Sequence, residues 1–444
     1  MNRTHIENVI EKLNEKILVQ GFIENIRNAK AMAFIIVKDI TGKLQITIEK
    51  EKCPHLCDIL DRLTPDSVIS VTGTAIKNDY VKLNGIEMLP ESIQAESIAE
   101  ALPIVRNKIP AAGNKLKLER SGIDQRIDYR WIDLRTDENQ LIFKVQTAMV
   151  NAMRQFLLDK KFLEIHSPKL IGTASESGAD VFRVEYFDRY AYLAQSPQFY
   201  KQMAMASGFE RVFEVGPVFR AEKSYTTRHT TEFTGFDLEM SYINSYRDIM
   251  DLEAELLIYV LGIIKEKYGR EIKECFDTEV VVPSFPFPVI TLNELYGELE
   301  KESGYVIDPA ERGDLTTNAE KLGSDWAMKK FGHEFLFVTD FDEKKRAFYH
   351  MRDSGGVPQG YDLIWRGVEI TTGAQREHRF EILQRQAKER GLEEDVKFYL
   401  EFFRYGCPPH GGFGLGVDRL TMLMLGLPIK EAMFVFRAPN RLNP

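Results

Sequence analysis

Residues 219–240 read FRAEKSYTTRHTTEFTGFDLEM, and they combine two alternating segments with a dense set of charged and aromatic side chains. Because strand side chains alternate between two faces, we expect residues 213–220 and 232–240 to pair as a hairpin around a polar loop. Arginine forks suit phosphate oxygens, and a phenylalanine face can hold adenine, so the pattern predicts a nucleotide site. The alternative is an exposed amphipathic hairpin, whose surface ion pairs contribute little.

Length and composition indicate a soluble protein of more than one domain. The 444 residues exceed a typical domain, and 44% hydrophobic with 28% charged residues is an ordinary globular balance. We expect a cytoplasmic location, because no apolar run is long enough to span a membrane and the N-terminal segment lacks a signal-peptide core. The few scattered cysteines fit a reducing compartment.

The chain as a whole is acidic, whereas one local segment is basic. A net charge of −9 argues against indiscriminate nucleic-acid binding. In residues 106–135, however, Lys and Arg outnumber Asp and Glu. We assign residues 105–136 to a basic hinge or linker, which could contact phosphates or could simply be solvated.

Residues 1–104 carry the pattern of a small β-barrel. Five β-rich segments are separated by turn signals, at residues 17–24, 33–40, 43–49, 68–76 and 81–88. A helical segment between the third and fourth strands is typical of the OB-fold, which binds single strands by aromatic stacking in a charged groove. Phe34 is the candidate stacking residue.

Residues 137–444 mix helices and strands without a strict βαβ rhythm. Helical periodicity is present over 139–160 and 246–268 and in two later segments, whereas residues 285–350 lack a regular pattern. This favours an α+β domain, with a mostly antiparallel β-sheet flanked by helices.

A second strong motif is GFGLGVDR at residues 412–419. Alternating glycines leave one strand face bare, so a ligand can approach the backbone closely. The following segment has a helical period, which places Arg419 at a helix N-terminus facing phosphate. The motif is neither a Walker loop nor a Rossmann fingerprint.

Together these motifs resemble the class II aminoacyl-tRNA synthetases, specifically the aspartyl-tRNA synthetase family of archaeal and eukaryotic type. FLEIHSPKL resembles motif 1, FRAE…RHTTEF motif 2 and GFGLGVDR motif 3, and the resemblance covers nearly the whole chain. It implies an anticodon-binding OB-fold over 1–104, a class II catalytic domain over 137–444, and a homodimer formed through motif 1.

The resemblance also implies roles at the ATP end of the site. Arg220 would hold the α-phosphate, Phe233 would stack on adenine, and Arg419 would hold the γ-phosphate, so that Arg220 and Arg419 are the expected catalytic residues. Further ATP contacts are implied for Glu222, Arg228, His229 and Glu369. A Mg²⁺ ion bound with ATP would take Glu369, Thr372 and Asp362, since hard oxygen ligands suit this ion.

Residues implied at the aspartate end come from separate segments. They are Glu176, Gln198, Lys201, Asp237 and Arg376. A bidentate arginine on a buried carboxylate selects aspartate, because the amide of asparagine would place donors against donors. Surface charge is the alternative reading of Lys201 and of Arg376.

The tRNA contacts implied by the resemblance lie in the barrel, where Phe34, Gln45 and Glu87 match the anticodon readers of the family. Three departures stand out. Lys161 replaces the glycine at the start of motif 1, which is neutral if the turn is not left-handed. FVFRAPNRLNP differs from the family pattern around Arg437 and Ala438, and Glu24 stands where some strictly tRNA(Asp)-specific relatives have tryptophan.

The resemblance therefore predicts an aspartate–tRNA ligase acting in two half-reactions. Aspartate and ATP would form aspartyl-adenylate and pyrophosphate, and aspartate would then pass to the 3′ end of tRNA(Asp). Whether tRNA(Asn) is a second acceptor stays open. The alternatives are a paralogue that makes a free amide from the adenylate, which typically lacks the barrel, and an inactive RNA-binding relative.

Overall fold

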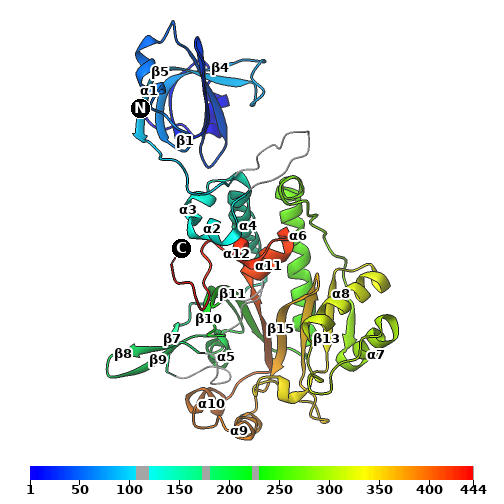
Figure 1. Ribbon diagram of the computed structural model, residues 1–444. Coiled ribbons are helices and arrows are strands. Elements are labelled where there is room, and N and C mark those ends of the chain that lie inside the picture. The colour runs from blue at the N-terminus through cyan, green and yellow to red at the C-terminus, as the bar shows by residue number, and fades with distance from the viewer. Residues whose placement is uncertain (107–119, 173–180, 223–229, 444) are drawn as a thin grey trace. The chain divides into compact units, whose positions relative to one another are not determined.

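The computed structural model describes residues 1–106, 120–172, 181–222 and 230–443, and the chain divides into two compact units (Figure 1). Unit 1 is Met1–Val105 and unit 2 is Arg106–Pro444. Across the described residues, no helix combines the length and the apolar character needed to cross a membrane.

Unit 1 is a closed barrel of five strands in the order β1-β2-β3-β5-β4. The strands are β1 (Lys16–Asn28), β2 (Met32–Lys38), β3 (Lys43–Glu49), β4 (Val68–Lys77) and β5 (Ile86–Ser97). The short α1 (Cys57–Leu60) lies between β3 and β4, beside a buried interior of Ile, Val and Leu side chains. The predicted OB-fold is confirmed.

The fifth strand lies later in the chain than expected. Residues 81–85 form a turn in which Asn84 and Gly85 have positive φ angles of 57° and 64°. Residues 86–97 then pair with β4, so the fifth strand extends through the segment PESIQAES. The sequence pattern did not indicate a strand over this segment because its composition is polar. Only one face of the strand packs inward.

Unit 2 is built on an eight-stranded sheet in the order β12-β13-β14-β15-β16-β11-β10-β6. Its bounds are β6 (Leu163–Glu164), β10 (Arg211–Phe219), β11 (Glu232–Ser241), β12 (Val289–Thr291), β13 (Phe335–Thr339), β14 (Gly360–Trp365), β15 (Val368–Arg376) and β16 (His410–Gly416). Among the described strands of this sheet, only the pairs β6·β10 and β12·β13 are parallel. The α+β assignment and the hairpin of β10 and β11 are confirmed.

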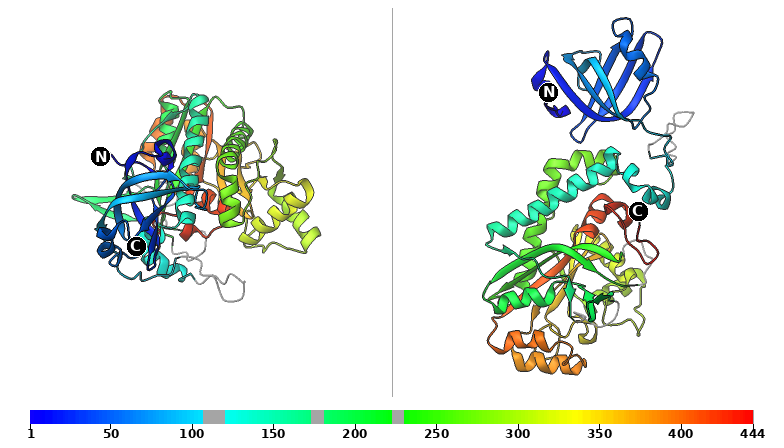
Figure 2. Two further views of the ribbon diagram at one scale, coloured as in Figure 1. Left: turned by 90° about the horizontal axis from the view of Figure 1, so that it is seen from above. Right: turned by 90° about the vertical axis from the view of Figure 1, so that its left-hand side faces the viewer.

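Helices α4 (Asp137–Asp159), α6 (Arg247–Phe276) and α11 (Val417–Leu425) pack on one face of this sheet (Figure 2). Thr136 caps α4 by accepting from the Asn139 amide, and Asp137 and Glu138 favour its positive end. Apolar residues at helical spacing, such as Ile142, Val145 and Met149, enter the core. Over β11, β15 and β16, the opposite face of the sheet carries polar groups.

Smaller elements complete unit 2. They are α2 (Ile123–Asp128), α3 (Arg130–Asp133), β7 (Leu170–Ile171), β8 (Arg183–Tyr186), β9 (Arg189–Leu193), α5 (Gln198–Ala206), α9 (Phe380–Glu389), α10 (Lys397–Arg404) and α12 (Ile429–Ala432). Part of the segment expected to be a basic linker is thus helical, with the side chains of Arg126 and Arg130 buried. Residues 107–119 lie outside the described residues.

The segment 285–350 is more regular than expected. It contains β12, α7 (Leu292–Ser303), α8 (Thr317–Phe331) and β13, around a core that includes Leu295 and Trp326. A capping box between Thr291 and Glu294 starts α7.

The turn at Lys161 is left-handed, with a φ angle of 65°. This conformation costs a non-glycine residue about 1 kcal/mol, so the replacement of glycine at this position is not neutral.

Candidate active site

A cavity of about 340 Å³ lies over the polar face of the unit 2 sheet. Strands β11, β15 and β16, the start of α5 and the loop at residues 345–350 supply its walls. The cavity brings together predicted residues from distant segments: Gln198, Arg220, Glu222, Phe233, Asp237, Glu369, Thr372, Arg376 and Arg419. Lys201 and Asp362 are buried beside it and do not line it.

The bare face of β16 gives room to two acidic side chains of β11. Asp237 pairs with Gly414, and Glu239 pairs with Gly412. A Cβ atom at Gly414 would lie 2.9 Å from Asp237 Oδ1, and one at Gly412 would lie 2.5 Å from Glu239 Oε2. The glycines therefore accommodate carboxylates of the protein itself, at the floor of the cavity.

Two cations and two anions form a buried quartet at this floor. Lys201 Nζ donates to Asp237 Oδ1 at 2.9 Å and lies 3.6 Å from Glu239 Oε2. Arg376 Nε donates to Glu239 Oε1 at 2.9 Å, and its Nη2 donates to the Gly412 carbonyl at 2.9 Å. Burial opposes ionisation of Glu239, but Arg376 and Lys201 outweigh it and lower its pKa. Glu239 is therefore ionised.

Glu239 is a residue that the sequence interpretation missed. It stands two positions after Asp237 on the same strand face, so strand periodicity was the available signal. His350 was missed as well: its Nε2 lies 3.4 Å from Arg376 Nη1 at the cavity wall. Burial and then Arg376 lower the His350 pKa well below its ordinary value, so the imidazole is neutral.

A chain of hydrogen bonds orients Gln198. Burial lowers the pKa of His410 to about 4, and its Nδ1 lies 2.8 Å from the Pro408 carbonyl, so Nδ1–H donates. His410 Nε2 then accepts from Gln202 Nε2 at 2.9 Å. This leaves Gln202 Oε1 to accept from Gln198 Nε2 at 3.0 Å. The Gln198 amide nitrogen thus faces Gln202, which directs its oxygen toward the cavity.

The other end of the cavity holds the predicted ATP residues. The Arg220 guanidinium lies 5.5 Å from the centre of the Phe233 ring, and its Nη1 lies 3.8 Å from Glu222 Oε1. Arg419, in the first turn of α11, donates to the Glu369 carbonyl at 2.9 Å. Glu176, Arg228 and His229 lie outside the described residues.

The predicted metal ligands Glu369, Thr372 and Asp362 have different hydrogen-bond partners. Burial and the neighbouring Asp362 raise the Glu369 pKa to about 7, and Thr372 Oγ1 donates to Glu369 Oε1 at 3.0 Å. Asp362 is held by Arg346, whose Nη1 and Nη2 donate to its two oxygens at 2.8 and 2.6 Å. Among the described residues, no set of three His, Cys, Asp or Glu side chains is arranged to hold a metal by itself.

In unit 1, the predicted anticodon residues share the outer face of the barrel. Gln45 pairs with Glu87 across β3 and β5, and Phe34 pairs with Thr47 across β2 and β3. Thr47 is hydrogen-bonded to both Gln45 and Glu87. Phe34 is half-buried, which leaves part of its ring open on this face.

The comparisons with known proteins agree with this geometry. The family model described as tRNA synthetases class II (D, K and N) matches residues 122–436. The chain belongs to this family. The family model of the OB-fold nucleic acid binding domain matches residues 17–95.

Two curated relatives identify the branch of the synthetase family. The aspartate–tRNA(Asp/Asn) ligase of Methanopyrus kandleri is 40% identical over 98% of this chain and 97% of its own length. The aspartate–tRNA(Asp) ligase of Pyrococcus abyssi is 39% identical over the full length of both. The crystal structure of asparaginyl-tRNA synthetase from Pyrococcus horikoshii with asparaginyl-adenylate superimposes with a TM-score of 0.88, at 30% identity over all of both chains.

Proposed function

We propose that this synthetase activates L-aspartate with ATP and transfers it to the 3′ end of tRNA(Asp). The observation that carries the amino-acid assignment is the quartet of Lys201, Asp237, Glu239 and Arg376. It supplies a fixed guanidinium at the cavity floor, and the relatives at 39% and 40% identity carry aspartate–tRNA ligase names.

The quartet accounts for a preference for aspartate over asparagine. Glu239 and the Gly412 carbonyl hold Nε and Nη2 of Arg376, so the guanidinium is oriented before substrate binds. The Nη1 edge, beside neutral His350, is then directed at the substrate carboxylate. An asparagine amide would place its NH₂ donors against these donors, which a buried site rejects strongly.

Binding of the α-amino group is the role proposed for Gln198, with Glu176 as a second contact. The hydrogen-bond chain from His410 directs the Gln198 oxygen, an acceptor, toward the cavity. An ammonium group has only donors, so the two match. The substrate would therefore be held at both ends, with its α-carboxylate left for reaction.

In the first half-reaction, this α-carboxylate attacks the α-phosphorus of ATP and pyrophosphate leaves. Phe233 holds the adenine, while Arg220 and Arg419 hold phosphate oxygens and neutralise the charge that develops on them. Arg228 and His229 are proposed as further ATP contacts, with Glu222 beside Arg220. Catalysis then rests on positioning and charge neutralisation, as is general for reactions at phosphorus.

Mg²⁺ fits the residues near Glu369. A buried carboxylate whose pKa is raised by another carboxylate is stabilised by a bound cation, and Thr372 adds an oxygen beside it. Mg²⁺ needs only one or two carboxylates when phosphates supply further oxygens. Bound there with ATP, the ion would neutralise phosphate charge. Asp362 would be available as a ligand only after release from Arg346.

The second half-reaction uses tRNA, whose terminal 3′-hydroxyl attacks the carbonyl of the adenylate, so that an ester forms and AMP leaves. We propose that Phe34, Gln45 and Glu87 read the anticodon, by stacking and by hydrogen bonds to base edges. Glu24 stands where some strictly tRNA(Asp)-specific relatives have tryptophan, so it bears on which tRNAs are accepted. Its Oε1 accepts a hydrogen bond from Lys43 Nζ at 2.6 Å. We leave tRNA(Asn) as a second proposed acceptor, and we propose a homodimer through motif 1.

ATP–pyrophosphate exchange with each amino acid tests the proposal. We expect stimulation by aspartate alone, and charging of tRNA(Asp) transcripts in the same preparation. Arg376→Leu should abolish aspartate-dependent exchange, whereas Arg385→Leu, an exposed position on α9, should not change it. Stimulation by asparagine, or by no amino acid, would reject the proposal.

A further inference from the structure

A segment near the C-terminus, residues 429–437, lies against the predicted adenine platform. Ile429, Met433 and Phe436 form an apolar cluster with Phe233 packed against it, and Ile429 also lines the cavity. The platform ring is therefore backed by side chains that are distant in sequence. Its position depends on where this segment lies.

The same segment is hydrogen-bonded to the base of the hairpin that carries Phe233. The Thr231 amide donates to the Arg437 carbonyl at 3.2 Å, and the Thr230 hydroxyl donates to the same carbonyl at 2.8 Å. The Thr231 carbonyl in turn accepts from the Arg220 amide at 2.9 Å. One backbone carbonyl of the segment thus fixes the strand end between Arg220 and Phe233.

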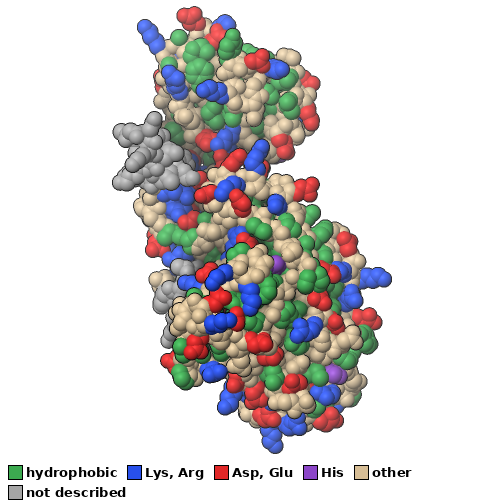
Figure 3. Space-filling view, turned by 90° about the vertical axis from the view of Figure 1, so that its right-hand side faces the viewer, with side chains coloured by type: hydrophobic (Ala, Val, Ile, Leu, Met, Phe, Trp, Pro, Cys, Tyr) green, Lys and Arg blue, Asp and Glu red, His purple; other side chains and the backbone are tan. Residues whose placement is uncertain are grey.

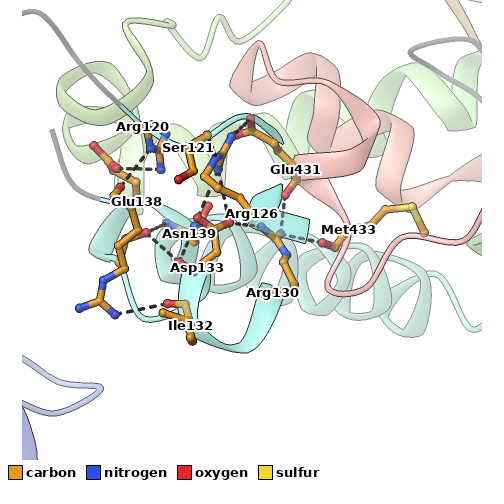
Figure 4. Close-up of polar contacts among 12 residues, drawn as sticks. Arg120, Ser121, Arg126, Arg130, Ile132, Asp133, Glu138, Asn139, Glu431 and Met433 are labelled. Carbon is orange, nitrogen blue, oxygen red and sulfur yellow. Dashed lines mark hydrogen bonds and ion pairs between the residues drawn. The ribbon is translucent and has the colours of Figure 1, made fainter. Parts of the chain in front are cut away.

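Arg130 of α3 holds this segment in place. Its Nη2 donates to the carbonyls of Glu431 and Met433, at 2.9 and 2.8 Å (Figure 4). Its Nε donates to the Phe434 carbonyl at 3.1 Å. Its Nη1 binds Asp133 at 2.7 Å, and the Arg130 side chain is only 2% exposed. Few residue types could replace it, because a planar fork satisfies three carbonyls at once.

Arg126 strengthens the arrangement from α2. It binds Asp133 at 3.3 Å and Glu431 Oε1 at 2.5 Å, so Asp133 lies between two arginines (Figure 4). The carbonyls that Arg130 binds are at the end of α12 and just beyond it, where no further turn of helix can satisfy them. Arg130 therefore acts as a side-chain cap for the segment.

We propose that residues 429–437 position Phe233 and the adjoining strand for ATP, and that Arg130 is the positioning residue that fixes this segment. The inference rests on the proposed ATP site. It assigns a role to the region where the sequence departs from the family pattern, around Arg437, through that residue's backbone carbonyl.

The test compares Arg130→Met, which keeps a long side chain but removes every donor, with Arg120→Met. Arg120 is close by and bonds instead to the Arg106 carbonyl and Glu138 (Figure 4). For Arg130→Met we expect KM for ATP and the Kd of ATP in calorimetric titration to rise about tenfold, because small misplacements of a binding surface are costly. KM for aspartate should change less than about twofold, and Arg120→Met should match the wild type.

A second pair of variants tests the other end of the contact, should Arg130→Met fail to fold. Thr230→Val removes the hydroxyl that binds the Arg437 carbonyl, and we expect the Kd of ATP to rise about fivefold, as for one lost hydrogen bond. Thr230→Ser retains the hydroxyl and should restore wild-type affinity.

Three outcomes are informative. Wild-type ATP affinity in both Arg130→Met and Thr230→Val overturns the inference. An equal rise of KM for ATP and for aspartate also overturns it, because it shows a general loosening of unit 2. Absence of aspartate-dependent exchange in the wild type rejects the proposed function instead, while the ATP titrations still decide the positioning role.

Discussion

Glu239 shows how much a single buried residue contributes to the candidate site. It is fully buried and lies between the two cations of the quartet, with Arg376 at 2.9 Å and Lys201 at 3.6 Å. Without it, two positive charges would face only Asp237 in a region of low polarity. Its contribution is therefore to hold Arg376 in one orientation.

Glu239→Gln should impair aspartate binding more than ATP binding. We expect kcat/KM for aspartate in the exchange reaction to fall about a hundredfold, because Arg376 loses its orientation. The free energy of unfolding should drop by about 3 kcal/mol, as for other broken buried pairs, which urea denaturation would measure. Glu255→Gln, an exposed change on α6, is the control. An unaltered KM for aspartate would contradict this role.

Glu253 offers a pH-dependent test within the core. Burial, with Asp362 adding to it, raises its pKa to about 7, and its Oε2 accepts from the Tyr361 hydroxyl at 2.7 Å. A carboxyl group with a raised pKa binds more protons when folded than when unfolded. Stability should therefore fall as pH rises from about 4.5 to about 7.

Glu253→Gln should remove this dependence. At pH 8 the variant should be more stable than the wild type by about 3 kcal/mol, while at pH 4 the two should be alike. Thermal unfolding at a series of pH values, with Glu255→Gln as the exposed control, measures the difference. Parallel pH profiles for the wild type and Glu253→Gln would show that Glu253 does not titrate in this range.

At the level of residues, motif spacing predicted which side chains meet, but not how they are paired. Asp237 and Arg376 were found because each lies in a recognisable motif. Glu239 and His350 were missed because their importance comes from burial and cross-strand contact. The pairing of Arg346 with Asp362 was equally invisible, since it depends on how a loop folds back onto β14.

At the level of elements, the turn before motif 1 carries avoidable strain. Lys161 has a left-handed backbone with a φ angle of 65°, whereas Lys160, with a φ angle of −88°, does not. The strand after this turn, β6, pairs with β10 at the edge of the main sheet. The turn thus sets where motif 1 meets the sheet.

Lys161→Gly should be more stable than Lys160→Gly by about 1 kcal/mol, because both changes add chain entropy but only the first relieves a left-handed backbone. Lys160→Gly is the matched control and should destabilise the protein by about 1 kcal/mol. The free energies of unfolding from urea denaturation give the comparison. Equal free energies of unfolding for the two variants would contradict the assignment of strain to residue 161.

Elements with a strong period or a glycine pattern were predicted well. The hairpin of β10 and β11, helix α4 and the strand of alternating glycines were all in place. The helices α7 and α8 were missed because their exposed faces are rich in charge, and β5 was displaced by a turn at Asn84 and Gly85. In both cases tertiary packing determined the structure, and a local sequence pattern contains little information about tertiary packing.

At the scale of the whole molecule, the two units have separate hydrophobic cores. On one face of the molecule, basic and acidic side chains are interspersed (Figure 3). Over the whole chain, Asp and Glu outnumber Lys and Arg, which gives the net charge of −9. We expect recognition of tRNA to depend on particular side chains, such as the proposed anticodon residues on the barrel face.

Phe34→Ala should separate the two half-reactions. Loss of one stacking platform should lower kcat/KM for tRNA(Asp) charging about tenfold, whereas ATP–pyrophosphate exchange should stay at the wild-type rate. Phe22→Ala is the control, because this partly exposed ring of β1 pairs with Lys38, four positions beyond Phe34 on β2. An equal loss of exchange and charging would show that the change acts on unit 2 as well.

The contact between Arg130 and residues 431–434 has a consequence for biosynthesis. Arg130 and Glu431 are 301 positions apart along the chain. A ribosome will have released the barrel, whose contacts are local, long before it makes the carbonyls that Arg130 needs. Until then the site that Arg130 fills stays open to water, so unit 2 must complete its packing late. A shortened product would lack the segment that supports the proposed nucleotide platform.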